Sequence, residues 1–278
     1  MKRAADEIKG KQMRPFLKWA GGKYRLVERI KAQLPAGRRL LEPFAGSCAL
    51  ALNTEYQDYW LNDINQDLIN LYQTLQTEGR EFIAFCRSYF TPDNNTPDRY
   101  YELRQAFNAE RDRTVRSALF VYLNRFGYNG LCRYNAGGEF NVPFGRYQQP
   151  YFPAAELEHF YTKFRRATFS CIDFEAMMGQ AGPRDVIYCD PPYVPLTRTS
   201  NFTAYSSGGF GAADQIRLAE VAARMARQGV VTLISNHYND FIAQTYRAAR
   251  IETFPVRRFI SCDGANRNSV LEVLAVFD

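Results

Sequence analysis

Residues 190–193 read Asp-Pro-Pro-Tyr and follow the apolar run 185–189, which is typical of a buried strand. The two prolines have no N–H and fix φ at about −65°, and the residue before each proline is kept out of the helical region. We therefore expect a stiff loop whose main-chain carbonyls remain available as acceptors. Asp190 adds a carboxylate and Tyr193 a flat face. Acceptors beside an aromatic ring complement a planar base with an exocyclic amino group.

A strand followed by a turn without chemistry is the alternative interpretation of residues 190–193. The composition does not decide between these two interpretations. A chain of 278 residues with 46% hydrophobic and 23% charged residues is typical of a soluble globular protein of one or two domains. No apolar run approaches the roughly 18 residues that span a bilayer, and the charged N-terminus lacks the apolar segment of a signal peptide. We expect no membrane segment.

The cysteines and histidines do not suggest a metal site. The six cysteines include no CxxC pair, and the chain has two histidines. We therefore expect neither a zinc site nor a disulfide framework, and a reducing cytoplasm is the natural location.

Positive charge is concentrated near the start of the chain. The net charge is +6, and residues 1–40 contain twelve Lys and Arg against three acids. Such a stretch suits a polyanionic partner. For residues 1–14 we prefer the simpler interpretation of a solvated tail, and we assign residues 1–15 to a flexible basic N-terminus.

Strand-like and helix-like runs alternate along much of the chain. Strand-like runs at 40–44 and 59–61 flank a turn and a short helix at 49–52, which indicates a β-α-β unit. A helix at about 212–228 ends at Gly229, a plausible cap. Further strand-like runs cover residues 168–172, 186–189, 230–234, 251–259 and 270–277. Strands that alternate with helices predict a mostly parallel sheet with helices on both faces.

Residues 66–165 differ from the rest, with helical periodicity and many aromatic residues. We predict an inserted, mainly helical domain there. The remaining segments, 16–65 and 166–278, form the α/β domain.

Gly46 and Asp63 suggest a nucleoside site. Gly46 lies in the turn after the first strand, where a missing Cβ lets a ligand approach the backbone. Asp63 follows the next strand, 17 residues after Gly46, near the spacing at which an acid meets ribose hydroxyls. The turn lacks a full pyrophosphate fingerprint, so S-adenosylmethionine fits better than NAD. A packing glycine and a solvated aspartate are the alternative.

Residues 19–23 place an indole, two glycines and a lysine within one short loop. Gly21 and Gly22 permit close approach of a ligand, and Lys23 suits a carboxylate such as the methionyl end of that cofactor. An ordinary loop before a helix is equally compatible with these residues.

Residues 116–149 contain eight aromatic residues, five glycines and four arginines but a single acid. Arg reads guanine in the major groove, Asn suits adenine or phosphate, and Leu contacts thymine methyls. Aromatic side chains wedge into base stacks. A loop packed by its own tyrosines would have the same composition, but together with the loop at 190–193 the pattern favours DNA recognition.

These motifs, in this order, resemble the Dam-type DNA adenine-N6 methyltransferases of the D12 class. The matching segments are 16–24, 42–46, 62–65, 124–134, 139–147, 190–193, 201–205 and 234–237. The resemblance implies a Rossmann-like α/β methyltransferase core with a mixed sheet and an inserted target-recognition domain at 66–165. It implies methyl transfer from S-adenosylmethionine to adenine N6 in double-stranded DNA, within GATC, by a monomer without a metal.

The family assigns roles to matching residues of this chain. Its Asp-Pro-Pro-Tyr loop holds an adenine flipped out of the duplex, which implies catalytic roles for Asp190, Pro191, Pro192 and Tyr193. The resemblance implies cofactor binding by Trp19, Gly22, Lys23, Phe44, Gly46, Asp63, Asp173, Phe174 and Asp190. It implies DNA binding by Lys18, Tyr128, Asn129, Leu131, Arg133, Asn135, Asn141, Pro143 and Arg146.

Two departures from the family pattern stand out. Cys48 occupies the second glycine of the first motif, which bears on how closely the turn approaches the methionine moiety. Residues 263–269 lack the extra lysines of the family, so we expect nonspecific DNA affinity to differ.

Two competing functions remain at this point. A cytosine-N4 methyltransferase uses the same loop geometry, although it usually has Ser where Asp190 stands. A non-catalytic DNA-binding regulator would keep the fold, although the intact loop and Asp63 argue against it. A protein-glutamine or RNA methyltransferase shares the loop but leaves residues 124–147 unexplained.

Overall fold

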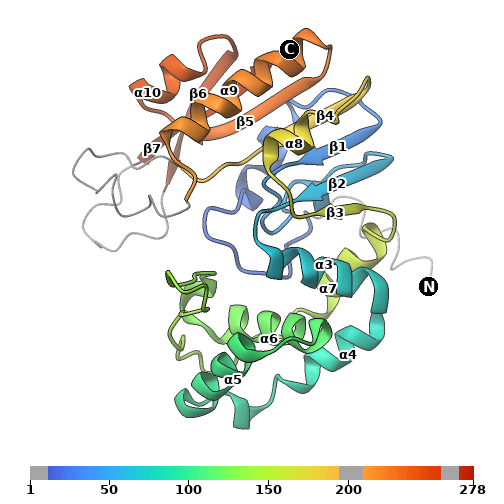
Figure 1. Cartoon of the computed structure of the whole chain (residues 1–278), viewed down its shortest axis with the longest axis vertical. Helices are drawn as coiled ribbons and strands as arrows, with labels where there is room; N and C mark the ends of the chain where they lie inside the picture. Colours follow the sequence, from blue (N-terminus) through green and yellow to red (C-terminus); the bar gives the residue numbers. More distant parts are fainter. Residues whose placement is uncertain (1–11, 194–208, 258–268) are drawn as a thin grey trace. The chain divides into compact units, whose positions relative to one another are not determined.

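The computed structural model describes residues 12–193, 209–257 and 269–278, which form two compact units (Figure 1). Within these residues, unit 1 contains 12–28, Gly46–Glu55 and Asn65–Cys171, and unit 2 contains Arg29–Ala45, Tyr56–Ile64 and the described part of 172–278. The motif at 201–205 and residues 263–268 lie outside the described residues.

Unit 1 is mainly helical and is built around α6 (Arg113–Phe126), whose ten residues from Ser117 to Phe126 are all buried. Helix α6 contacts α3, α4 and α5. The helices begin where the sequence supplies caps: the Asp112 carboxylate accepts from Val115 N–H at the start of α6, and Thr96 caps α5. The other elements are η1 (Tyr24–Leu26), η2 (Ala51–Asn53), α3 (Gln66–Glu78), α4 (Arg80–Ser88), η3 (Pro92–Asn94), α5 (Pro97–Ala109), η4 (Tyr128–Gly130), α7 (Ala154–Lys163) and β3 (Thr168–Ser170).

Unit 2 contains most of the sheet, whose strand order is β3-β2-β1-β4-β5-β7-β6 (Figure 1). Strands β2, β1, β4 and β5 pair in parallel, and β5, β7 and β6 pair antiparallel. The α/β class with a mixed sheet is therefore confirmed. The elements of this unit are β1 (Arg39–Glu42), β2 (Asp58–Asn62), α8 (Phe174–Met178), β4 (Asp185–Cys189), α9 (Ala212–Arg227), β5 (Val231–His237), α10 (Asp240–Thr245), β6 (Arg250–Arg257) and β7 (Ser269–Phe277), and α2 (Val27–Lys31) spans the unit boundary in sequence.

One face of the sheet packs against α8, α9 and α10. Alternate residues of each strand reach this core, as the two-residue period of a strand requires: Ile187 and Cys189 come from β4, and Val273, Ala275 and Phe277 from β7. Helix α9 ends as predicted near Gly229, which has φ +76°, while Val230 N–H donates to Met225 C=O at 3.0 Å. The helix thus stops where β5 must begin.

The helix predicted at 49–52 is wrong in length, because only the 3-10 turn η2 forms there. Asn53 Nδ2 donates to Ala49 O at 2.8 Å and Thr54 Oγ1 donates to Ala51 O at 3.2 Å, so side chains take carbonyls that a longer helix would use.

The unit boundaries also differ from the predicted domain boundaries. Residues 16–28 and Gly46–Glu55 group with unit 1, although the sequence analysis placed them in the α/β domain. Residues 1–11 of the N-terminal stretch lie outside the described residues. Met13, within that stretch, is held by Asn53, whose Oδ1 accepts from Met13 N–H at 2.7 Å.

Across the described residues, no helix is long and apolar enough to cross a membrane. The same residues contain no group of three or more His, Cys, Asp or Glu arranged to hold a metal ion.

Candidate active site

Three predicted site residues follow three neighbouring parallel strands of unit 2. Phe44 and Asp63 each lie two residues past the paired positions Glu42 of β1 and Leu61 of β2. Phe44 and Asp190 each lie three residues past the paired positions Leu41 and Ile187. The register therefore brings all three to the same edge of the sheet. Strand order reverses between β1 and β4, where open α/β sheets bind ligands.

Asp190 is held by a chain of hydroxyl groups. Ser235 Oγ lies 3.0 Å from Asp190 Oδ1 and 3.0 Å from the Tyr188 hydroxyl. Burial raises the pKa of Tyr188, so its hydroxyl keeps its proton. Because a serine has one proton and a carboxylate only accepts, Tyr188 donates to Ser235 and Ser235 donates to Asp190. The Asp190 side chain thus has a fixed orientation on β4 and β5.

The other end of the loop is held as well. The Tyr193 ring packs on the imidazole of His237, with centroids 3.9 Å apart and planes inclined by 55°. The carbonyl of Pro192 accepts from Gln215 Nε2 of α9 at 2.9 Å. Residues 190–193 are therefore anchored at Asp190, Pro192 and Tyr193.

Phe44 belongs to an aromatic cluster in unit 2. Its ring lies 5.4 Å from Phe174 and 5.3 Å from Phe210, and the Arg217 guanidinium lies 4.2 Å from the Phe174 centroid. Asn62 positions the neighbouring backbone, since its Nδ2 donates to Pro43 O at 3.0 Å and to Ile172 O at 2.9 Å. The cluster is thus framed by β1, β2 and α8.

Asp173 caps α8 and also pairs with Arg217. Its Oδ1 accepts from Glu175 N–H at 2.9 Å and from Arg217 Nη1 at 3.0 Å, and its Oδ2 accepts from Arg217 Nη2 at 2.9 Å. Burial acts to raise the pKa of Asp173, but these hydrogen bonds and the Arg217 charge outweigh it, so the pKa is lowered. With three of about four acceptor positions used, the carboxylate has little capacity left for a ligand.

Unit 1 brings together two motifs that the sequence analysis treated separately. A Cβ on Gly46, which has φ +46°, would lie 2.7 Å from Trp19 Nε1, so only glycine lets the indole lie against this turn. The Gly46 carbonyl accepts a hydrogen bond from the buried Tyr72 hydroxyl. Lys23 is 5% exposed, and its Nζ donates to Gly21 O at 2.9 Å. A Cβ on Gly22 would meet Trp19 O at 3.1 Å.

Cys48 has φ +57° and is fully buried. This left-handed conformation is the one that glycine adopts without strain, and a side chain there costs about 1–2 kcal/mol. The backbone at position 48 therefore keeps the shape expected of a glycine although the residue is a cysteine.

Lys18 is positioned by a buried asparagine. Asn124 Oδ1 accepts from Lys18 N–H at 2.9 Å, and its Nδ2 donates to Lys18 O at 2.8 Å and to Gly130 O at 3.1 Å. The Lys18 ammonium lies 3.9 Å from the Tyr147 ring centroid. A Cβ on Gly130, which has φ +63°, would collide with the Lys18 side chain, so these residues lie in direct contact.

Tyr128 and its neighbours form an exposed turn. Tyr128 is 51% exposed, and its N–H donates to Pro143 O at 2.8 Å. Asn129 has φ +53°, and its N–H donates to the Tyr147 hydroxyl at 3.0 Å. Arg146 also has φ +53°. The backbone of this turn is well defined while the Tyr128 ring faces outward.

The remaining predicted DNA-binding residues of unit 1 form hydrogen bonds with neighbouring protein groups. Arg133 Nε donates to Asn141 Oδ1 at 2.7 Å and its Nη2 to Asn141 O at 3.1 Å. Asn135 Nδ2 donates to Glu139 Oε2 at 2.9 Å. All three side chains therefore contact protein groups, and Arg133 and Asn135 are also exposed. Leu131 is half-buried, and its N–H donates to Tyr128 O at 3.1 Å.

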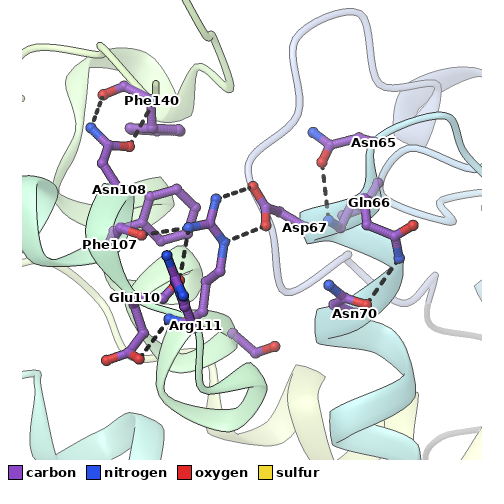
Figure 2. A network of polar contacts seen from close by, with 12 residues as sticks. Asn65, Gln66, Asp67, Asn70, Phe107, Asn108, Glu110, Arg111 and Phe140 are labelled. Carbon is purple, nitrogen blue, oxygen red and sulfur yellow. Dashed lines mark hydrogen bonds and ion pairs between the residues drawn. The ribbon is translucent and has the colours of Figure 1, made fainter. Parts of the chain in front are cut away.

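A polar network formed by residues of α3, α5 and α6 holds Tyr134 and Phe140 (Figure 2). The Asp67 carboxylate takes two hydrogen bonds from Arg116, at 2.6 and 2.9 Å, and one from the Tyr134 hydroxyl at 2.8 Å. Asn108 pairs with the backbone of Phe140, accepting from its N–H at 2.8 Å and donating to its C=O at 3.2 Å. Tyr134 and Phe140, which form a β-bridge with each other, are thus both anchored to helices.

Comparisons with known proteins identify the family of this chain. Residues 19–258 match the family model described as D12 class N6 adenine-specific DNA methyltransferase. The chain belongs to this family. A protein named DNA adenine methylase from Vibrio cholerae serotype O1 is 49% identical over 268 residues, covering 96% of this chain and 97% of its own length.

Two further relatives carry the same name. The protein from Salmonella typhimurium (strain LT2) is 48% identical and that from Escherichia coli (strain K12) 47% identical, each over 267 residues and 96% of both chains. The methyltransferase therefore acts on adenine N6 in DNA and requires a methyl donor. The cytosine-N4 and regulator alternatives are set aside.

Sequence reasoning missed several residues that hold the candidate site. Ser235, Gln215 and Asn124 are buried polar side chains that contact predicted site residues. Asn124 and Ser235 lie inside the segments that match the family, 124–134 and 234–237. This match was the sign in the sequence that could have identified them. Nothing in the sequence around Gln215 indicated its contact with a loop more than twenty residues away.

Proposed function

We propose that this methyltransferase transfers a methyl group from S-adenosylmethionine to N6 of a flipped-out adenine within GATC in duplex DNA. Residues 16–65 and 166–278 serve as the catalytic domain and 66–165 as the target-recognition domain. The protein acts in the cytoplasm on DNA, as a monomer. The relatives' name, DNA adenine methylase, and their full-length similarity support this proposal.

One observation carries the proposal. The 190–193 loop follows β4 at the switch point of the sheet, with Asp190 oriented by Ser235 and Pro192 held by Gln215. A loop fixed in this way offers acceptors in a constant geometry. Acceptors held in this way suit an exocyclic amine. A surface turn without chemistry would not need these anchors.

The residues present fit S-adenosylmethionine. The Phe44 cluster offers an aromatic surface, and Asp63 lies at the strand edge where nucleotide folds bind ribose. By the family pattern, Trp19, Gly22 and Lys23 bind the cofactor, and Lys23 suits its methionyl carboxylate. When bound, this cofactor supplies an electrophilic methyl group.

Asp190 and the Pro191 carbonyl accept hydrogen bonds from the adenine amine, and Tyr193 stacks on the base. The N6 lone pair of adenine is delocalised into the ring and is a poor nucleophile. Acceptors on both N–H groups draw the nitrogen toward tetrahedral geometry and localise the lone pair. No strong base is needed, because the N–H proton becomes acidic only as the methyl group arrives. Positioning supplies much of the rate, and flipping costs a few kcal/mol, offset in the pocket.

Recognition of DNA falls to residues of unit 1. Lys18 and Arg133 read the guanines of GATC, Leu131 and Pro143 lie near thymine, and Tyr128 inserts at the flipped base. The exposure of Tyr128 on a firmly bonded turn supports insertion. Asn129, Asn135, Asn141 and Arg146 support base or phosphate contacts, with Asn141 acting on Arg133.

The direct test is Asp190→Ala, assayed with tritiated methyl transfer to duplex oligonucleotides that differ at single bases. We expect methylation to be abolished while DNA binding is largely kept, because Asp190 contacts the reacting amine and no other part of the DNA. Retained turnover would contradict the mechanism. Equal methylation of all single-base variants of GATC by the wild-type protein would contradict the proposed specificity.

A further inference from the structure

Three fully buried polar residues of unit 2 meet beside the 190–193 loop. Gln215 of α9, Asn236 of β5 and Tyr246, which follows α10, are each 0% exposed. Gln215 reaches the loop, since its Nε2 donates to Pro192 O at 2.9 Å. Buried polar side chains are costly unless satisfied, so a complete network of this kind specifies one arrangement.

The donors and acceptors of this network have one consistent assignment. Gln215 Oε1 lies 2.7 Å from the Tyr246 hydroxyl and 3.1 Å from Asn236 Nδ2. Asn236 Nδ2 also donates to the Tyr246 hydroxyl at 3.1 Å, and Asn236 Oδ1 accepts from His237 N–H at 2.8 Å. The atom of the Gln215 amide that faces these two donors must therefore be its oxygen, because the amide nitrogen only donates. The nitrogen is left facing Pro192.

Consecutive residues of β5 thus act on consecutive parts of the loop. Ser235 bonds Asp190, Asn236 orients Gln215 toward Pro192, and His237 packs on Tyr193. Because Pro191 and Pro192 have no N–H, the middle of the loop offers only carbonyls as hydrogen-bonding groups. Gln215 donates a hydrogen bond to one of these carbonyls, that of Pro192.

We infer that Gln215, oriented by Asn236 and Tyr246, is a positioning residue for methyl transfer. It fixes the Pro192 peptide and with it the direction of the Asp190 and Pro191 acceptors. This inference rests on the proposed function of the 190–193 loop. Gln215 acts through that loop and touches neither the base nor the methyl donor.

Gln215→Met and Gln215→Glu test the inference in the full-length protein. Methionine has similar length but no donor, so we expect the single-turnover methylation rate to fall about 100-fold. The dissociation constant for GATC duplex and the KM for S-adenosylmethionine should stay close to wild type, because a positioning defect lowers kcat.

Gln215→Glu gives a readout that a purely structural role would not move. A protonated glutamic acid has the shape of the glutamine amide and again donates to Pro192, whereas the carboxylate places an acceptor against an acceptor. Burial raises the pKa of such a group. The rate of this variant should therefore fall as pH rises through that pKa, with the wild-type profile measured in parallel.

Met225→Ala is the matched control, because Met225 is a buried residue of α9 that packs in the core. It should lower the free energy of unfolding without changing the rate per folded enzyme. A wild-type rate in folded Gln215→Met would overturn the inference. If that variant does not fold, Gln215→Glu decides, and a pH profile identical to wild type overturns it. Loss of activity in Asp190→Ala with no loss in Gln215→Met would leave the proposed function standing and remove only the positioning role.

Discussion

The 190–193 loop of unit 2 and the 128–146 segment of unit 1 are held in opposite ways. The loop is fixed by the buried side chains of Ser235 and Gln215 and by the ring of His237. The segment is exposed at Tyr128 and Arg133, and its backbone includes two non-glycine residues with φ +53°.

This difference suits the roles that we propose for the two regions. Acceptors that act on a reacting nitrogen work best when their geometry is fixed before the substrate arrives. Side chains that read DNA must instead leave protein partners for bases and phosphates, so hydrogen bonds that are easily exchanged suit them. The exposed Arg133, which is hydrogen-bonded to Asn141, has that character.

Among the substitutions that test the comparison between the two regions, Arg116→Met should have the largest effect, which is a loss of stability. It leaves the Asp67 carboxylate without its bidentate partner, with Arg116 and Asp67 side chains 23% and 14% exposed. Since breaking a fully buried pair costs 3–5 kcal/mol, we expect a loss of about 2–3 kcal/mol here. Urea unfolding measures it.

Asp67→Leu and the double variant complete a cycle for this pair. We expect the double variant to be more stable than the sum of single losses predicts, because no charge is left unpaired. Strict additivity would show that Arg116 and Asp67 do not stabilise each other, although their side chains are hydrogen-bonded in the network of Figure 2.

Arg133→Ala should relax discrimination at one guanine by about 1–3 kcal/mol. The check is kcat/KM on GATC and on duplexes with that guanine replaced. Arg111→Ala removes another exposed positive charge, outside this segment, and should lower affinity without changing selectivity. Unchanged selectivity of the Arg133 variant would remove it from the guanine-reading set.

Lys18 should make DNA binding depend on pH. Burial, and then the charge of Arg125, lower the pKa of Lys18 to about 8. The free protein therefore loses this charge as pH rises through 8, whereas phosphates stabilise it in the complex. Binding then takes up a proton, and affinity should fall up to about tenfold per pH unit above 8 and little below 7.

Fluorescence anisotropy with a GATC duplex between pH 6.5 and 9.5 measures this dependence. Lys18→Arg is the control, because arginine stays charged throughout this range. A profile for Lys18→Arg that matches wild type would assign the titration to another group.

Substitution of Cys48 should have the smallest effect. It tests whether a left-handed backbone conformation is also strained outside the 128–146 segment. Cys48→Gly relieves the strain at φ +57°, whereas Cys48→Ala keeps it and removes the same sulfur atom. We expect the glycine variant to be more stable than the alanine variant by about 0.5–1 kcal/mol, after the greater flexibility of unfolded glycine is counted. Equal stabilities would show that position 48 does not require a glycine conformation.

Local sequence determined much of this molecule. The apolar run 185–189 followed by two prolines predicted a strand and a stiff loop, and β4 ends at Cys189. Gly229 marked the end of α9, and Asp112 and Thr96 mark the starts of α6 and α5. These features depend on backbone dihedrals and neighbouring residues, which a sequence displays directly.

Only the tertiary structure decided which distant polar groups hold the site. The distances along the chain from Ser235 to Asp190, from Gln215 to Pro192 and from Asn124 to Lys18 give no sign of contact. Each of these side chains alone would be a costly buried polar group, and it becomes stabilising only when folding brings its partner within hydrogen-bond distance. The sequence displays the chemistry of the 190–193 loop, but the direction in which its acceptors point depends on packing between α9, α10 and β5.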